Sequence, residues 1–173
     1  MSGFVAAIPD KRYEGQQGIE SGAQDTLDVI AHLRQNAARY NIDAKRMCLW
    51  TFSAGGSLAQ VGIAPENGLS CVVAYCGLGQ AGPRIAVRQH AEKMPPMLVV
   101  RAGRDGAPGN NAIDVFLSSA LALNAPVTFL NYPAGLHAFE VEDTRPETKD
   151  SANVAQTERI LRVTLDWMKA QMK

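Results

Sequence analysis

Short, nearly continuous apolar runs alternate with longer amphipathic stretches along most of the chain. A continuous apolar run is typical of a parallel strand buried on both faces, whereas apolar residues at helical spacing indicate a surface helix. The pattern predicts strands at 3–9, 46–52, 70–75, 97–102 and 126–132, and helices at about 21–40, 54–62, 82–92, 111–123 and 151–171. This alternation predicts an α/β fold: a three-layer sandwich with a mainly parallel sheet of about five strands.

The corner after the second predicted strand is the most informative stretch of the chain. Ser53 follows the apolar run 46–52 and precedes Ala54, Gly55 and Gly56, where the next helix begins. A serine at such a corner is typical of a nucleophile elbow, in which the hydroxyl stands above the strand ends. The elbow would also aim the Ala54 backbone N–H, with the positive end of the helix dipole, at a developing oxyanion.

The same stretch also has a purely structural interpretation. The usual elbow pattern is G-x-S-x-G, because the residues two before and two after the serine lie close together. Here Thr51 stands in the place of the first glycine. Ser53 would then only cap an ordinary helix that follows a buried strand. Two further positions favour the elbow.

An elbow serine needs an acid and a base in the chain order Ser, Asp or Glu, His, on loops at one edge of the sheet. Asp105 follows the strand 97–102 in a glycine-flanked turn, and His137 follows the strand 126–132. Both side chains are expected at the carboxyl ends of parallel strands, beside Ser53. The sequence therefore predicts a catalytic triad of Ser53, Asp105 and His137.

Other acids and histidines fit this role less well. Asp105 alone would be explained as a turn former before glycine. Asp114 is a rival acid, but we place it in the first turn of a helix, where the dipole favours a carboxylate. His32 lies within a helical pattern and His90 near a helix end, so both are most simply structural or solvent-facing. His137 is the histidine that follows a predicted strand.

Together these features resemble the α/β-hydrolase superfamily, in its dienelactone hydrolase-like and carboxylesterase branch. The segments that carry the resemblance are 3–10, 23–40, the elbow, 101–105 and 136–141. Members closest to true dienelactone hydrolases carry a cysteine nucleophile, so Ser53 directs the expectation toward general ester hydrolysis. Ser53 would attack the ester carbonyl, His137 would move its proton, and Asp105 would orient the imidazole.

The resemblance also implies a missing part. In this superfamily further strands precede the one that residues 3–9 resemble, and the loop after the third strand donates a second oxyanion N–H. The 173 residues contain no such segment, so we expect either a fragment or a compact variant that lacks roughly the first third of the usual domain. If the strand 4–8 moved beside the nucleophile strand, the backbone of Lys11 or Arg12 and the hydroxyl of Tyr13 would supply that donor. The alternative is that this loop is solvated, with Tyr13 half-buried.

Composition narrows the remaining classes. With 173 residues and 46% apolar side chains, the chain can bury about 70% of its unfolded surface, so we expect a single domain spanning 1–173. The charges of seventeen basic and seventeen acidic residues cancel, which argues against a nucleic-acid partner. No apolar run approaches the ~20 residues of a membrane span. Cys48, Cys71 and Cys76 lack metal-ligand spacing, so the sequence predicts free thiols in a reducing cytoplasm, with no metal and no cofactor.

The resulting expectation is a cytoplasmic serine esterase for small-molecule esters. A missing third strand would leave an apolar sheet edge, which predicts a homodimer. Two alternatives remain open. One is a weak or inactive hydrolase-like domain that acts in binding or assembly, favoured by Thr51 and by the missing oxyanion segment. The other is a cofactor-binding module of flavodoxin type, which needs phosphate-binding loops that the sequence does not show.

Overall fold

The protein is built around a parallel sheet with helices on both faces. The structure is a computed structural model that describes residues 3–10, 12, 15–79, 81–142 and 151–173. Its sheet has the order β1 (Cys48–Phe52), β2 (Cys71–Tyr75), β3 (Met97–Ala102), β4 (Val127–Tyr132). The helices are α1 (Gly15–Gln35), α2 (Ala37–Tyr40), α3 (Ala59–Ile63), α4 (Ala81–His90), α5 (Ala107–Ala122), α6 (Phe139–Glu142) and α7 (Ser151–Gln171), with short 3₁₀ turns η1 (Ser53–Leu58) and η2 (Pro65–Asn67). The predicted α/β class with a parallel sheet is confirmed.

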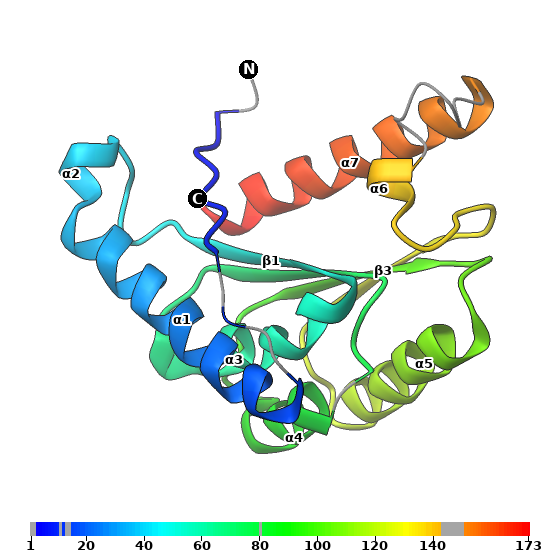
Figure 1. Ribbon diagram of the computed structural model, residues 1–173, viewed down its shortest axis with the longest axis horizontal. Helices are drawn as coiled ribbons and strands as arrows, with labels where there is room; N and C mark the ends of the chain where they lie inside the picture. The colour runs from blue at the N-terminus through cyan, green and yellow to red at the C-terminus, as the bar shows by residue number, and fades with distance from the viewer. Residues whose placement is uncertain (1–2, 11, 13–14, 80, 143–150) are drawn as a thin grey trace.

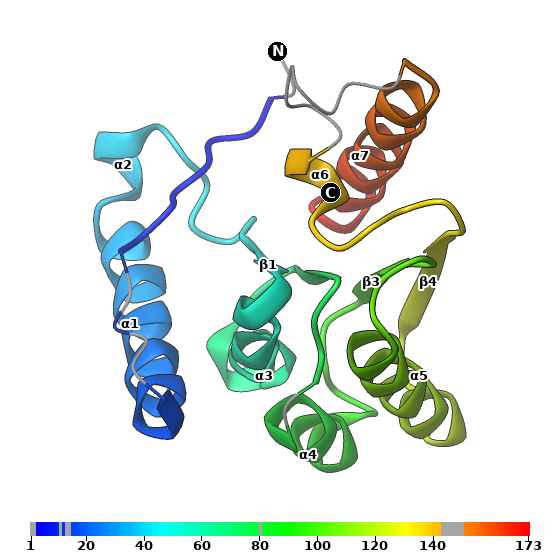
Figure 2. The ribbon, with the colours of Figure 1, turned by 45° about the vertical axis from the view of Figure 1, so that its right-hand side comes forward.

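The two central strands are buried on both faces because helices cover them from above and below (Figure 1). Along β2 the side chains alternate: Val72 and Ala74 pack toward α3, α4 and α5, while Val73 and Tyr75 pack toward α6 and α7. The outer strands β1 and β4 are only partly buried. Figure 2 shows α3, α4 and α5 beneath the sheet and α6 and α7 above it.

The register of the strands brings their carboxyl ends to one edge of the sheet. Phe52 at the end of β1 pairs with Tyr75 at the end of β2, and Ala102 at the end of β3 pairs with Tyr132 at the end of β4. The loops that follow the four strands therefore emerge side by side. This edge is where the predicted site residues were expected to meet.

The strand predicted at residues 3–9 is wrong. The structure gives these residues no strand, and within the described chain β1 pairs only with β2. In Figure 1 the segment runs across the direction of the strands on its way to α1. Val5 and Ile8 are 64% and 95% exposed, and only Phe4 packs against the sheet's α7 face. An apolar segment becomes a strand only when a partner strand satisfies its backbone groups, and here none does.

The helices were predicted in the right order but with displaced ends. The helix predicted at 21–40 is instead α1 followed by α2, and the residues after Ser53 form η1 before α3 begins. Helix α5 begins at Ala107, with Pro108 in its first turn, a position where proline is favoured. Among the described residues, no helix combines the length and the apolar character needed to cross a membrane.

The cysteines differ from their prediction. Cys48 in β1 and Cys71 in β2 are directly paired neighbours, and a disulfide joins them. The prediction of free thiols is therefore wrong for these two and holds for Cys76, which is free and buried. Because disulfides persist mainly in oxidising compartments, the cysteines no longer support a cytoplasmic location.

Candidate active site

Ser53 sits at a strained corner between β1 and η1. Its φ of 49° lies in the left-handed region, which is uncommon for a residue with a side chain. The corner is packed from behind by glycine backbone: a Cβ on Gly77 would overlap the Ser53 carbonyl, and a Cβ on Gly56 would overlap the Gly77 carbonyl. These close approaches hold the hydroxyl of Ser53 above the strand ends, as in a nucleophile elbow.

The structure brings Ser53, His137 and Asp105 into one chain of contacts. Ser53 Oγ lies 2.6 Å from His137 Nε2, and His137 Nδ1 lies 2.8 Å from Asp105 Oδ2. The side chain of Asp105 is 8% exposed, whereas that of His137 is 47% exposed. A carboxylate can only accept, so Nδ1–H donates to Asp105 and Nε2 is left to accept from the serine hydroxyl. This is the arrangement in which an imidazole can remove the hydroxyl proton.

The loops that carry the acid and the base are bonded to each other. Gly103 N–H donates to the Tyr132 carbonyl at 2.7 Å, and Arg104 N–H donates to the Gly135 carbonyl at 2.8 Å. A Cβ on Gly103 would come within 2.6 Å of the Pro133 carbonyl oxygen. The spacing between Asp105 and His137 is therefore fixed by backbone as well as by their own contact.

Backbone strain is concentrated at this edge of the sheet. Five non-glycine residues of the described chain have positive φ, and two of them are asparagines, which tolerate this conformation. The other three are Ser53, Cys76 and Ala138, which lie after β1, after β2 and in the loop after β4. Strained residues cluster at functional sites, where the surrounding structure holds them.

The position of Thr51 is now explained. Thr51 is buried, and its hydroxyl donates to the Val73 carbonyl at 3.3 Å, so its extra polar group has a partner. The close backbone approaches at the elbow fall on Gly56 and Gly77. Gly77 was not among the predicted site residues, because its neighbour Ser53 is distant along the chain. The available signal was a glycine two residues after the predicted strand 70–75.

Cys76 lies beneath the loops that hold Asp105 and His137. The pKa of its thiol is raised to about 12, mainly by burial and also by the nearby charges of Glu140 and Asp105, while backbone hydrogen bonds from Ala138 and Ala102 oppose the shift. The thiol is therefore neutral at physiological pH. It is a packing group of this site rather than a second nucleophile.

The segment expected to supply a second oxyanion donor is only partly described. Lys11 and Tyr13 lie outside the described residues. The backbone N–H of Arg12 donates to Asp25 Oδ2 at 2.8 Å, and its guanidinium pairs with the same carboxylate at the exposed face of α1. These bonds from Arg12 hold the pKa of Asp25 below its ordinary value. The Arg12 donor therefore has a partner other than an oxyanion, while Ala54 is exposed directly after Ser53.

The rival residues lie elsewhere. Asp114 is in the middle of α5 rather than in a first turn, and its carboxylate accepts from Arg101 Nε at 3.1 Å. His32 Nε2, on α1, lies 3.0 Å from the hydroxyl of Tyr40, on α2. His90 ends α4. Within the described residues, no group of three histidine, cysteine, aspartate or glutamate side chains is arranged to hold a metal ion.

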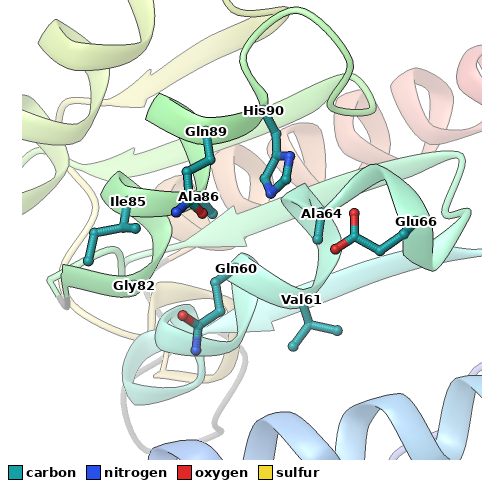
Figure 3. A pocket seen from close by; sticks show the side chains of 9 residues that line it. All are labelled: Gln60, Val61, Ala64, Glu66, Gly82, Ile85, Ala86, Gln89 and His90. Carbon is teal, nitrogen blue, oxygen red and sulfur yellow. The ribbon is translucent and has the colours of Figure 1, made fainter.

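A cavity of about 320 Å³ lies between α3 and α4, away from the triad (Figure 3). Gln60 and Val61 line it from one side and Ile85 and His90 from the other. None of the three triad residues is among its walls. The chemistry of the strand ends, rather than this cavity, marks the candidate active site.

Comparisons with known proteins agree with this fold. The family model BD-FAE matches residues 1–70, which include Ser53 but neither Asp105 nor His137. No curated protein matches the chain. Among solved structures, one of two fungal esterases from Rhizomucor miehei aligns with a TM-score of 0.69 at 15% identity, over 88% of this chain and 61% of its own.

Two further structures give the same result. An esterase from Thermogutta terrifontis with bound propionate aligns with a TM-score of 0.62 at 17% identity, over 87% of this chain and 66% of its own. MGS-M1, an α/β hydrolase from a Medee basin deep-sea metagenome library, aligns with a TM-score of 0.65 at 17% identity, over 94% of this chain and 68% of its own. The chain thus spans about three fifths to two thirds of these proteins. It has the fold of the α/β-hydrolase superfamily, as its sequence predicted.

Proposed function

We propose that this protein is a serine hydrolase that cleaves small carboxylic esters through an acyl-enzyme. The observation that carries the proposal is the pair of consecutive contacts from Ser53 Oγ to His137 and from His137 to Asp105, at 2.6 and 2.8 Å. Esterase folds among the structural neighbours support the same reaction class.

In the proposed reaction, Ser53 Oγ attacks the ester carbonyl while His137 Nε2 takes the hydroxyl proton. The tetrahedral intermediate then collapses, the ester C–O bond breaks, and His137 returns the proton to the leaving alcohol. Water, activated by the same imidazole, hydrolyses the acyl–Ser53 ester. Asp105 keeps the imidazole oriented and stabilises its cation in both halves.

The oxyanion is the weak point of this machinery. We assign one donor to the backbone N–H of Ala54, at the start of η1, and leave Lys11 and Tyr13 as candidates for the second. Each such donor is typically worth about 3 to 4 kcal/mol of transition-state stabilisation. The backbone N–H of Arg12 donates to Asp25 and is therefore not available to an oxyanion. A site in which Ala54 is the single oxyanion donor would hydrolyse esters slowly. This observation favours the alternative function, a weak or inactive hydrolase-like domain used in binding or assembly.

A short-chain p-nitrophenyl ester and a fluorophosphonate probe separate the two functions. Turnover together with labelling, both lost in Ser53→Ala, supports the esterase. Labelling without turnover supports the weak or inactive domain, because it shows a reactive elbow without an oxyanion site. Neither labelling nor turnover in the wild-type protein would refute both the nucleophile assignment and the esterase.

We also propose that the chain forms a homodimer through the outer edge of β1. That edge has no partner strand in the described chain, and Val5 and Ile8, in the segment before α1, are exposed apolar residues. Among the described residues, the buried indole N–H of Trp50 on β1 has no hydrogen-bond partner. Unpaired apolar edges promote association. A monomer in light scattering at every concentration tested would refute this proposal.

Three narrower assignments stay predictions: a single domain over 1–173, a place in the dienelactone hydrolase-like branch, and a cytoplasmic location. The first would show as one cooperative unfolding transition. The cytoplasmic location would be contradicted if Cys48 and Cys71 were found disulfide-bonded in protein isolated from its native compartment.

A further inference from the structure

Asn110 is a buried polar side chain directly behind the acid of the triad. It lies in the first turn of α5 and is 5% exposed. Its side-chain Nδ2 donates to the backbone carbonyl of Asp105 at 3.2 Å. It therefore touches the main chain of Asp105 but neither Ser53 nor the imidazole.

The turn that Asn110 closes is held by several short-range bonds. Asp105 N–H donates to the Ala102 carbonyl at 3.1 Å, and Asp105 Oδ1 accepts from Gly106 N–H at 2.7 Å. Asn110 N–H donates to the Gly106 carbonyl at 3.2 Å. Asp105 Oδ2 is thereby directed at His137 Nδ1. The side chain of Asn110 adds the bond that ties the acid itself to α5.

One atom of the Asn110 amide has no partner. Its Oδ1 is buried and accepts no hydrogen bond in the described chain. A buried acceptor without a partner costs about 1 to 3 kcal/mol, whereas an apolar residue of the same shape avoids that cost. Packing alone therefore disfavours asparagine at this position, and the contribution that favours it is the Nδ2 donor to Asp105.

We propose that Asn110 is a positioning residue for the triad, which fixes the backbone of Asp105 so that its carboxylate stays on His137. This role rests on the proposed esterase function. Without the Nδ2 donor, the partly buried carbonyl of Asp105 loses this partner, and the turn is free to shift. A displacement of this kind weakens the bond from Asp105 to the imidazole and so the preparation of Ser53 for attack.

Asn110→Leu removes the donor at nearly constant shape, and Asn111→Leu, at the exposed neighbouring position, is the matched control. We expect kcat to fall by about tenfold to a hundredfold in Asn110→Leu, with KM within about twofold of the wild type. The pH profile of kcat/KM should also change, because the contact between Asp105 and the imidazole is weakened. A structural role alone would lower activity equally at every pH.

The result that overturns the proposal is an Asn110→Leu protein with wild-type kcat and an unchanged pH profile. If that variant does not fold, Asn110→Asp replaces it, since a carboxylate of the same size cannot donate above neutral pH; wild-type kinetics there would equally overturn the role. Failure of the esterase itself is seen separately, as a wild-type protein without turnover. In that case the NMR titration of His137, assigned with His137→Gln, still tests the role, and equal midpoints in wild type and Asn110→Leu refute it.

Discussion

The two sides of Ser53 are built in different ways. On the acid–base side, defined as the loops 103–106 and 133–138, backbone hydrogen bonds of 2.7 and 2.8 Å join the loops, and Asp105 and His137 lie in contact. On the N-terminal side, defined as the outer edge of β1 with residues 3–10 and 12, no described strand pairs with this outer edge, and the opposite edge of β1 pairs with β2. The groups for proton transfer, Asp105 and His137, are held in contact with each other. No comparable set of hydrogen bonds holds an oxyanion donor on the N-terminal side, where the described donor Arg12 N–H is bonded to Asp25.

The difference follows from the strands beneath each side. The acid–base loops follow β3 and β4, and these two strands pair with each other over six residue pairs. The N-terminal side borders β1, whose apolar residues are half-buried, and the indole N–H of Trp50 finds no acceptor in the part of the chain that the structure describes. A positioned base and nucleophile therefore lie beside a sheet edge that no described strand covers.

The largest effect is expected on the acid–base side. Asp105→Asn should lower kcat by about four orders of magnitude, as the corresponding change does in serine proteases, because an amide favours the wrong tautomer of His137. Asp114→Asn is the control, since Asp114 contacts Arg101 at the surface, and its kinetics should match the wild type. Steady-state hydrolysis of a p-nitrophenyl ester measures both. Damage by Asp114→Asn instead would show that the acid is misassigned.

The elbow itself should be the next most sensitive place. An added Cβ in Gly77→Ala would overlap the Ser53 carbonyl, whereas in Gly79→Ala it would meet the Cβ of Ala112 at an ordinary 3.6 Å. We expect Gly77→Ala to lose about 1 to 3 kcal/mol of unfolding free energy in urea and most of its activity. Gly79→Ala should change neither. Equal behaviour of the two variants would mean that the Gly77 approach does not hold the nucleophile.

Much of the acid–base side was predictable from sequence, since Ser53, Asp105 and His137 each follow a continuous apolar run that forms a strand. The N-terminal side was not. The apolar pattern of residues 3–9 suits a strand, but pairing depends on a partner that the pattern does not contain. The Cys48–Cys71 disulfide depends in the same way on the register of β1 with β2. The contacts of Gly77 and Asn110 are not revealed by the local pattern. Pro108 lies in the first turn of α5, where proline is favoured, and was an available signal for the start of this helix.

The N-terminal side can be tested with a pair of tryptophans. Trp50 has a buried indole N–H without a partner among the described residues, while Trp167 Nε1 donates to the Thr128 hydroxyl at 3.3 Å. If the β1 edge stays uncovered, Trp50→Phe should be neutral or raise the unfolding free energy by about 1 kcal/mol, and Trp167→Phe should lower it by about 1 kcal/mol. Chemical denaturation measures both. A clear loss of stability in Trp50→Phe would show that its N–H is bonded in solution, as expected if another strand covers β1.

A smaller effect is expected from pH. Burial raises the pKa of Cys76 to about 12, while the thiol of the unfolded chain ionises near 8.5. Above that value the unfolded state loses its proton first, so the unfolding free energy should fall with rising pH, by about 0.8 kcal/mol at pH 9. Cys76→Ala should lack this part of the slope. Identical slopes in the two proteins between pH 7.5 and 9 would show that the thiol is not held neutral beneath the site.

The central claim is that Ser53 forms an acyl-enzyme with the help of His137 and Asp105. The most direct measurement is intact-protein mass spectrometry of samples quenched in acid within milliseconds to seconds of mixing with p-nitrophenyl acetate. We expect a mass increase of one acetyl group that maps to Ser53 and that is absent in Ser53→Ala and nearly absent in His137→Gln. An acetyl group on another residue, or equal acetylation of Ser53 in His137→Gln, would contradict the account.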